Sequence, residues 1–324
     1  MTRILSYRFS DRATRQSLRN VLSLAVLFLL VGMIAFLTKM DRTALALNIN
    51  LNFHAFTTFV ANHFLTPCFP IFFGLVLFLE WLKPSGVRGG LFSKGFAYDA
   101  SIGLFALAFQ FLAVNLVMGM LFKLYAIAHV PVLGPAVHRW NNWVVAVLSL
   151  TVSDFFNWAS HVVRHKVPRL WRFHAMHHSQ RELNIFTEFR CHPMDSLTAS
   201  VIQSLPLYLM QVPFTISVAC LVIYKYYLMF THANVDMNYG FVGRLLVSPR
   251  FHRVHHGRGP EFYDHNFGAV LSIWDWIFGT SKSFPTTSIE TGTDDFPAEH
   301  DHAFQNPLPL YLRQLVKPFE SGEV

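Results

Sequence analysis

The chain contains two copies of the pattern Arg-Phe-His-x-x-His-His. The histidines of these two copies are His174, His177, His178, His252, His255 and His256. Residues three and four positions apart share one face of an α-helix, so each copy places three imidazole rings on one face. A buried imidazole needs a polar partner, and neutral imidazole is a common metal ligand. The spacing therefore favours metal binding over a basic surface, which lysine or arginine would provide at any spacing.

Four further histidines lie in the same part of the chain: His161, His165, His192 and His232. The first two are four residues apart at the end of an apolar segment, and the other two are single. With the two copies they give ten candidate ligands. Ten imidazoles are too many for one ion, so we expect two ions with about five ligands each and room for an exogenous oxygen ligand. Imidazole binds zinc, copper, iron and nickel, so ligand type does not name the metal.

Three aspartates could accept ring N–H groups from these histidines. Asp154 lies seven residues before His161, on the same helical face. Asp195 and Asp236 follow the two single histidines by three and four residues. Each of the three fits this role, and each also fits that of a solvated acid near a membrane surface.

The composition predicts a membrane protein. The 324 residues are 52% hydrophobic and 14% charged, with a mean hydropathy of +0.34. This is more apolar than an ordinary soluble domain. The net charge of +7 fits basic loops at an anionic membrane surface better than nucleic-acid binding, so we expect no nucleic-acid partner. Cys68, Cys191 and Cys220 are widely spaced and odd in number, which indicates neither a disulfide framework nor a cysteine metal site.

Apolar segments predict an all-α integral membrane protein with about four transmembrane helices and a helical hairpin. A helix that crosses a bilayer needs about 20 apolar residues. The expected spans are 21–37, 66–82, 99–122 and 142–160, and the expected hairpin is 197–230. The hairpin segment is interrupted by Pro206 and Pro213 and is expected to enter and leave the membrane on one side.

Lysine and arginine residues in the short loops predict on which side of the membrane each loop lies. They favour a cytoplasmic N-terminus and a cytoplasmic helical cap that carries the histidine-rich site for two metal ions. Three regions are expected: an N-terminal transmembrane region at 1–140, a catalytic region at 141–280, and a polar tail at 281–324 that ends in a short interfacial helix.

The motifs resemble those of the fatty acid hydroxylase and sterol desaturase superfamily of integral membrane di-iron oxygenases. The matching patterns are one H-x-x-x-H and two H-x-x-H-H, supported by "RCHPMD", "FTHANVD" and "DHNFGAVLSIWDWIFGT", over about residues 145–280. His265 is left out of the ligand set, and Asn266 is assigned a supporting role next to the ligands.

The resemblance implies a di-iron centre, dioxygen as co-substrate and a lipid substrate that is hydroxylated or desaturated. No catalytic side chain beyond the metal centre is implied, and zinc would be an inactive substitute for iron. Electrons would come from a separate cytochrome b5-like or ferredoxin-like donor. The basic stretch that could dock this donor contains Arg164, Lys166, Arg169 and Arg172.

Other classes of membrane protein also use histidine. A metal-binding or metal-transport protein would place its ligands near the middle of the bilayer. A haem quinol oxidase would carry paired ligands within transmembrane helices, and a zinc hydrolase would use fewer ligands and an acidic base. The clustering at helix ends favours the oxygenase, with the metal-transport protein as the alternative.

Overall fold

The computed structural model describes residues 68–85, 93–137, 139–212, 214–284, 289–296 and 307–319. Within these ranges the regular elements are helices, joined by three isolated β-bridges. The all-helical prediction is confirmed for this part of the chain. The predicted span at 21–37 lies outside the described residues.

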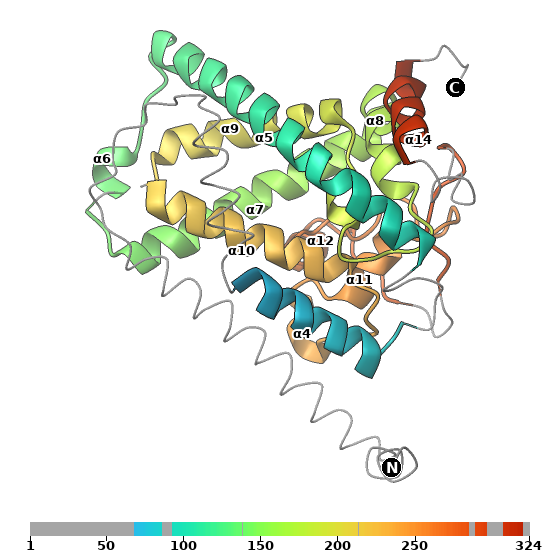
Figure 1. Ribbon diagram of the computed structural model, residues 1–324. Coiled ribbons are helices and arrows are strands. Elements are labelled where there is room, and N and C mark those ends of the chain that lie inside the picture. Colours follow the sequence, from blue (N-terminus) through green and yellow to red (C-terminus); the bar gives the residue numbers. More distant parts are fainter. Residues whose placement is uncertain are drawn as a thin grey trace.

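Five long helices form the body of the molecule (Figure 1). They are α4 (Cys68–Leu82), α5 (Lys94–Ile127), α7 (Asn142–Lys166), α9 (Pro193–Met210) and α10 (Phe214–His232). The shorter elements are α6 (Gly134–Val137), α8 (Pro168–His178), η1 (Thr187–Phe189), η2 (Gly240–Arg244), α11 (Pro249–His255), α12 (Ile273–Ile277), α14 (Pro307–Val316) and η3 (Lys317–Phe319). Helix α9 packs against α5 and α7, and α10 packs against α7 and α11.

The predicted hairpin corresponds to α9 and α10. Its turn lies at the end of the molecule remote from the histidines, where Val212 and Ile216 pack against Val145 of α7. Both open ends of the hairpin therefore return to the histidine side, as expected. Pro206 does not interrupt the segment, because it lies inside α9. The helix ends instead at Gln211, whose φ of 44° is left-handed.

Helix α7 is the one element of the described ranges that is both long and apolar enough to cross a membrane. Its 25 residues have a length of about 37 Å, against about 30 Å for a bilayer core. Helix α4 contains a shorter apolar segment, Phe69–Leu82. The number of membrane crossings and their orientation stay predictions.

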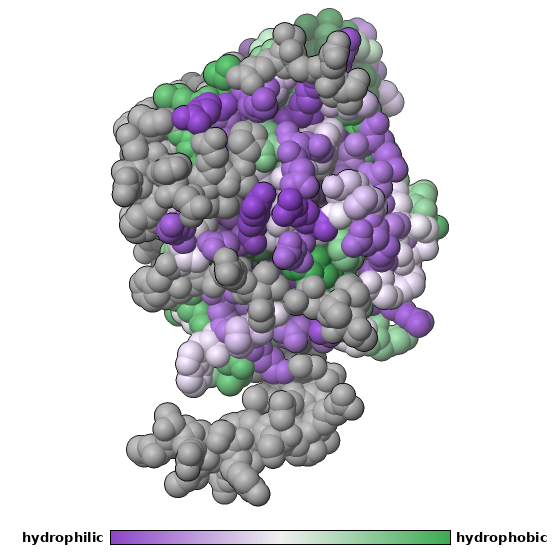
Figure 2. Space-filling view, turned by 90° about the vertical axis from the view of Figure 1, so that its right-hand side faces the viewer, coloured by the Kyte–Doolittle hydropathy of each residue, from purple (hydrophilic) through white to green (hydrophobic). Residues whose placement is uncertain are grey.

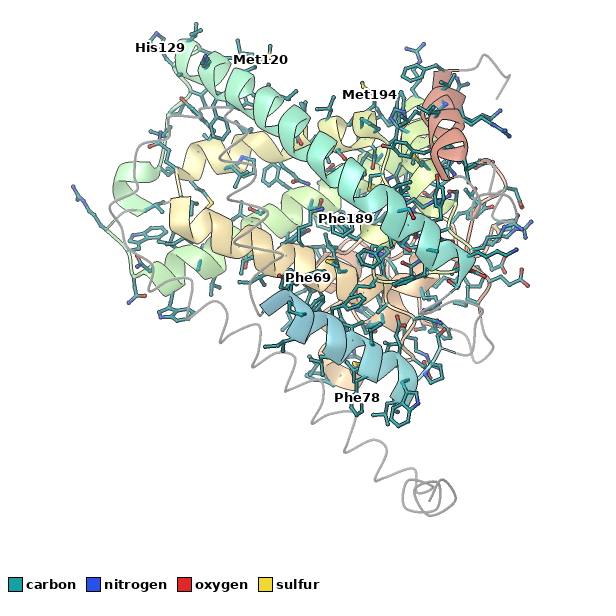
Figure 3. All side chains as sticks on the ribbon, viewed as in Figure 1. Phe69, Phe78, Met120, His129, Phe189 and Met194 are labelled. Atoms are coloured by element: carbon teal, nitrogen blue, oxygen red, sulfur yellow. The ribbon has the colours of Figure 1, made fainter. Side chains whose placement is uncertain are left out.

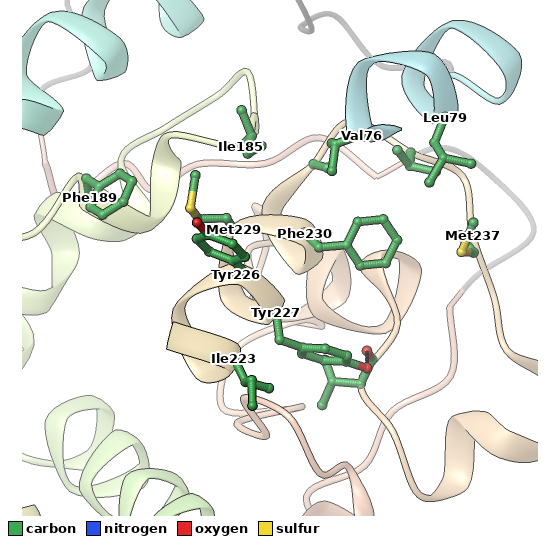
Figure 4. Close-up of a cluster of buried hydrophobic side chains, with 13 residues drawn as sticks. Val76, Leu79, Ile185, Phe189, Ile223, Tyr226, Tyr227, Met229, Phe230 and Met237 are labelled. Carbon is green, nitrogen blue, oxygen red and sulfur yellow. Dashed lines mark hydrogen bonds between the residues drawn. The ribbon is translucent and has the colours of Figure 1, made fainter. Parts of the chain in front are cut away.

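An apolar cluster fixes the end of α10 that carries His232 (Figure 4). Val76 and Leu79 of α4 pack there with Phe230 of α10. Phe69, at the beginning of α4 (Figure 3), packs against the same cluster, with its ring centroid 6.1 Å from that of Tyr226. Burial of such large side chains stabilises by about 1.5–3 kcal/mol each, so the end of α10 has little freedom to move.

A buried ion pair ties α5 to the end of α8. Arg190 Nη1 donates to Asp99 Oδ1 at 3.1 Å, and both side chains are fully buried. The other carboxylate oxygen accepts from Gln180 Nε2, Asn184 Nδ2 and Thr187 Oγ1. Arg190 Nε also donates to the carbonyl of Met176, next to His177. The pair thereby holds the histidine-bearing end of α8 against α5.

We predict that Asp99→Asn lowers the free energy of unfolding by about 3–5 kcal/mol, because it leaves the Arg190 guanidinium buried without a counter-ion. Denaturant unfolding of the purified chain in detergent measures this. Asp294→Asn is the control, since Asp294 pairs with Arg258 at the surface and should matter little. Equal effects of the two substitutions would contradict the prediction.

Candidate metal centre

Nine of the ten predicted histidines converge into two groups, and within each group one nitrogen of every ring lies within 4.8 Å of the corresponding nitrogens of the others. The first group is His161, His165, His174, His178 and His255. The second group is His177, His232, His252 and His256. The groups adjoin, because the ring of His178 stacks on that of His256 with centroids 4.4 Å apart. The expected arrangement of two neighbouring sites is present, with five and four imidazoles.

Each repeated pattern contributes to both groups. Helix α8 gives His174 and His178 to the first group and His177 to the second. Helix α11 with its C-cap gives His255 to the first and the other two of its histidines to the second. Positions i and i+4 of a helix point to one side, while i+3 is turned away by about 60° from i. One short helix can therefore supply ligands to two adjacent ions.

Several pairs of ring nitrogens are as close to each other as two ligands of one metal ion would be. His161 Nε2 lies 3.0 Å from His174 Nε2. His232 Nε2 lies 3.2 Å from His177 Nε2 and 3.0 Å from His252 Nε2. Two nitrogens at about 2.1 Å from one metal, and at right angles, are about 3 Å apart. The spacing fits metal coordination.

Several buried ring nitrogens have no hydrogen-bond partner among the described residues. These atoms are His165 Nε2, His178 Nε2, His255 Nε2, His252 Nδ1 and both nitrogens of His256. A buried polar atom without a partner costs about 1–3 kcal/mol. So many in one small volume would destabilise the fold unless cations bound their lone pairs. This donor set fits two metal ions.

The protonation states suit the same role. Burial, followed by the positive charge of neighbouring rings, lowers the pKa well below 6.5 for His177, His178, His252 and His256. Burial lowers the pKa of His255 to about 3, although its hydrogen bond to the backbone opposes this. The rings of α8 and α11 are therefore neutral at pH 7, and a neutral imidazole carries a lone pair for a metal.

Backbone carbonyls orient three of the rings. His161 Nδ1 lies 2.9 Å from the carbonyl of Phe267, and His255 Nδ1 lies 2.9 Å from that of His265. His232 Nδ1 lies 2.7 Å from the carbonyl of Leu228, one turn earlier in α10. A carbonyl only accepts, so each Nδ1 carries the proton and each Nε2 is left with a lone pair directed into its group.

Asp195 orients a different histidine from the one expected. Its Oδ2 accepts from His174 Nδ1 at 3.0 Å and from Arg164 Nη1 at 2.9 Å, whereas the ring nitrogens of His192 bind other partners. Burial would raise the pKa of Asp195, but the positive charge of Arg164 and the hydrogen bonds from His174 and Arg164 outweigh this effect and lower the pKa to about 2. Asp195 is therefore ionised and fixes the ring of His174.

Asp154 binds the loop that follows His265 and does not bind a histidine ring, which corrects its predicted role. It accepts from the backbone N–H groups of Val270 and Leu271 at 3.0 Å and from Trp274 Nε1 at 2.9 Å. Asp275, which the sequence reasoning missed, accepts from the N–H groups of Phe267 and Gly268 nearby. The two buried carboxylates hold the loop that presents its carbonyls to the histidines.

Asn266 supports the same loop without touching a ring. Its φ of 58° is left-handed, and its side chain donates to the carbonyls of Phe251 and Lys282. The carbonyls of the residues on either side of Asn266 are those that orient His255 and His161. The supporting role expected of Asn266 is thus exerted through the backbone.

Two predicted site residues lie elsewhere. His192 caps α9: its Nδ1 accepts from the N–H of Met194, and its Nε2 donates to the carbonyl of Leu315. With both nitrogens engaged, it belongs to neither group, and the ligand role predicted for it is corrected. Asp236 pairs with Arg250 at 3.1 Å and does not accept from His232.

The sequence reasoning also missed a buried acid beside the second group. Glu188 Oε2 lies 3.9 Å from His232 Nδ1, and its other oxygen accepts from Lys225 Nζ at 2.7 Å. Cys191 Sγ lies 3.9 Å from His177 Nδ1, and burial raises the pKa of this thiol, as expected of a buried cysteine without ligand function. Glu188 and Lys225 are 37 positions apart, so no local spacing could have shown their pairing.

Comparison with known proteins identifies the segment that carries these groups. The fatty acid hydroxylase family matches residues 146–280, which include all nine clustered histidines. No solved structure matches this chain.

Three curated relatives illustrate the range of activities. Ornithine lipid hydroxylase OlsE of Rhizobium tropici is 33% identical, over 58% of this chain and 56% of its own length. Alkylglycerol monooxygenase of Homo sapiens is 31% identical, over 44% of this chain and 32% of its own. Delta(7)-sterol-C5(6)-desaturase of Nicotiana tabacum is 27% identical, over 44% of this chain and 52% of its own. The chain thus spans between a third and about half of these relatives.

Substitution of His192 and His232, the two single histidines, distinguishes a metal ligand from a helix cap. We predict that His192→Asn leaves the bound metal content unchanged, because asparagine is also a good N-cap. His232→Asn should lower metal content, since it removes a ring from the group of four. Metal analysis of both purified proteins tests this. Metal loss in His192→Asn with retained folding would restore that residue as a ligand.

The lowered pKa values predict that the metal-free protein becomes less stable at acidic pH. Unfolded histidines titrate near 6.5, so below that pH the unfolded chain binds more protons than the folded one. The free energy of unfolding should then fall as pH falls from 6.5 towards about 3, by about 1.4 kcal/mol per pH unit for each such histidine. Denaturant unfolding of the chelator-treated protein measures this. A stability that stays constant between pH 6.5 and 4.5 would contradict it.

Proposed function

Because residues 146–280 match the fatty acid hydroxylase family, we propose that this chain is a membrane-bound oxidoreductase that hydroxylates a lipid C–H bond with dioxygen. One observation carries the proposal: two adjacent groups made only of imidazoles lie at the end of the apolar helix α7. Hydroxylation is preferred over desaturation because the ornithine lipid hydroxylase and the alkylglycerol monooxygenase are more similar to this chain than the sterol desaturase is.

Iron is the metal we propose for both groups, with zinc as an inactive substitute. The five rings of the first group would hold one ion and the four rings of the second the other. When bound, the two ions would supply the redox chemistry that reduces dioxygen with electrons from an external donor and functionalises the lipid. Fewer rings in the second group leave more room there for an oxygen ligand.

The chain itself contributes orientation and exclusion of water. The clustered rings are buried, with His165 the most accessible of them. The carbonyls of Phe267 and His265, and the carboxylate of Asp195, fix three rings in the rotation needed for ligation. Ligands that are already held in position, in a site from which water is excluded, limit side reactions of an activated oxidant with water or with the protein.

The depth of the site suits a lipid substrate. His161 lies 19 residues beyond the start of α7, about 28 Å along the helix and so near the edge of a bilayer core of about 30 Å. A lipid would then reach the metals from within the membrane, while a soluble donor would approach from the aqueous side. The face of the molecule shown in Figure 2 is largely hydrophilic and suits that approach.

The basic surface proposed for the donor needs one correction. Arg164 is buried in its pair with Asp195 and cannot contact a partner. Lys166 and Arg169 are exposed close to the histidines and, with the half-buried Arg172, remain the proposed docking residues for a cytochrome b5-like or ferredoxin-like donor. The metal-transport alternative is disfavoured, since a transported ion needs a path to and from its ligands and these rings are buried.

We predict that cells making this chain accumulate a lipid heavier by one oxygen atom, and that cells making His177→Ala or His255→Ala do not. Each alanine removes one ring from a different group. Lipid mass spectrometry, with iron analysis of the purified variants, provides the measurement. Full activity and full iron content in either variant would exclude this site, and bound metal without oxygen consumption would favour the transport protein.

A further inference from the structure

Two segments, one before and one after α11 in the sequence, expose six large apolar side chains. They are Phe241, Val242 and Leu245 around η2, and Trp276, Ile277 and Phe278 around α12. Phe241 is 83% exposed and Ile277 61%. Single exposed apolar residues are ordinary, but a contiguous set marks an interaction surface. We refer to these six residues as the apolar patch.

The two halves of the apolar patch form one surface. Ser272 N donates to the carbonyl of Leu245, and Ser272 Oγ donates to that of Gly243, which joins η2 to the start of α12. The Arg244 guanidinium lies 5.9 Å from the ring centroid of Phe241 and 5.8 Å from that of Trp276. This arginine therefore sits between aromatic rings from both halves.

The apolar patch continues the lipid-facing side of α7. Trp158 of α7 stacks on Phe278 with centroids 4.5 Å apart, and Phe155 contacts Trp274 at 5.1 Å. The buried carboxylate of Asp275 anchors α12 on its inner side, so the neighbouring Trp276 and Ile277 face outward. The packing gives the apolar patch a fixed position along α7.

That position lies within the thickness of a bilayer core. Trp140 and Trp143 are exposed at the beginning of α7, as is typical of residues at a membrane surface. Trp158 is 16 residues beyond Asn142, about 24 Å along the helix, and a bilayer core is about 30 Å thick. The apolar patch beside Trp158 is thus level with the leaflet nearer the histidines.

We propose that the apolar patch is inserted into this leaflet, with Arg244 at its lipid headgroups. The occupant is the lipid bilayer, because the surface is continuous with α7 and combines aromatic and aliphatic residues with one cation, as interfacial segments do. Insertion would hold the metal centre at a constant depth relative to the lipid chains. This inference rests on the proposed membrane function, since it requires α7 to be embedded.

Site-specific fluorescence tests the insertion. A genetically encoded, environment-sensitive fluorescent amino acid replaces Phe241, Ile277, Val147 or Tyr263, one at a time, in the full chain. Val147 is an exposed residue of α7, and Tyr263 is an exposed aromatic residue among the charged loops. The proteins are reconstituted in vesicles of phosphatidylcholine and phosphatidylglycerol. Quenching is measured with nitroxides on the acyl chains and with iodide in the water.

We expect nitroxide quenching and loss of iodide quenching at positions 241, 277 and 147, and the reverse at 263. Ile277→Asp should reduce nitroxide quenching at position 241, whereas the matched Tyr263→Asp should not. Iodide quenching at 241 and 277, with nitroxide quenching at 147, would overturn the inserted patch alone. Iodide quenching at 147 as well would show that α7 is not embedded, and the proposed membrane function would fail with it.

Discussion

The burial of nine imidazoles in one small volume is the constraint on which the rest of the structure depends. Protonated rings at these spacings would repel one another in a medium that screens charge poorly, so they must be neutral and share cations. Neutral rings still need their N–H groups satisfied and their lone pairs directed. The surrounding elements meet this need: the loop at 265–275 offers carbonyls, Asp195 offers a carboxylate, and α10 offers its own backbone.

Three buried carboxylates act at a distance from the imidazole groups. Asp99, paired with Arg190, fixes the histidine-bearing end of α8 against α5. Asp154 and Asp275 fix the loop that orients His161 and His255. None of the three touches an imidazole, yet each determines where a ring can lie. Their loss would displace ligands without removing one, which explains why a site of this kind needs residues spread over so many elements.

Helix α7 also connects the apolar part of the molecule with the imidazole groups. Helix α7 begins with exposed tryptophans and ends with two of the histidines, so a single rigid element sets the height of the first group. The hairpin of α9 and α10 starts and finishes at the same end and delivers His232 to the second group. With α12 packed beside Trp158, the lobe that holds the rings is attached to α7 on more than one side.

Local spacing in the sequence was sufficient to predict the all-helical class of the described residues, the two repeated patterns and the family resemblance, because i, i+3 and i+4 contacts are decided within one helix. It failed where the partner lies far along the chain. Asp195, Asp154 and Asp236 sit near histidines in sequence, but tertiary packing gives them other partners. His192 looked like a ligand by its motif and became a helix cap. Only the fold decided which rings lie together, because that depends on how α7, α8, α10 and α11 meet.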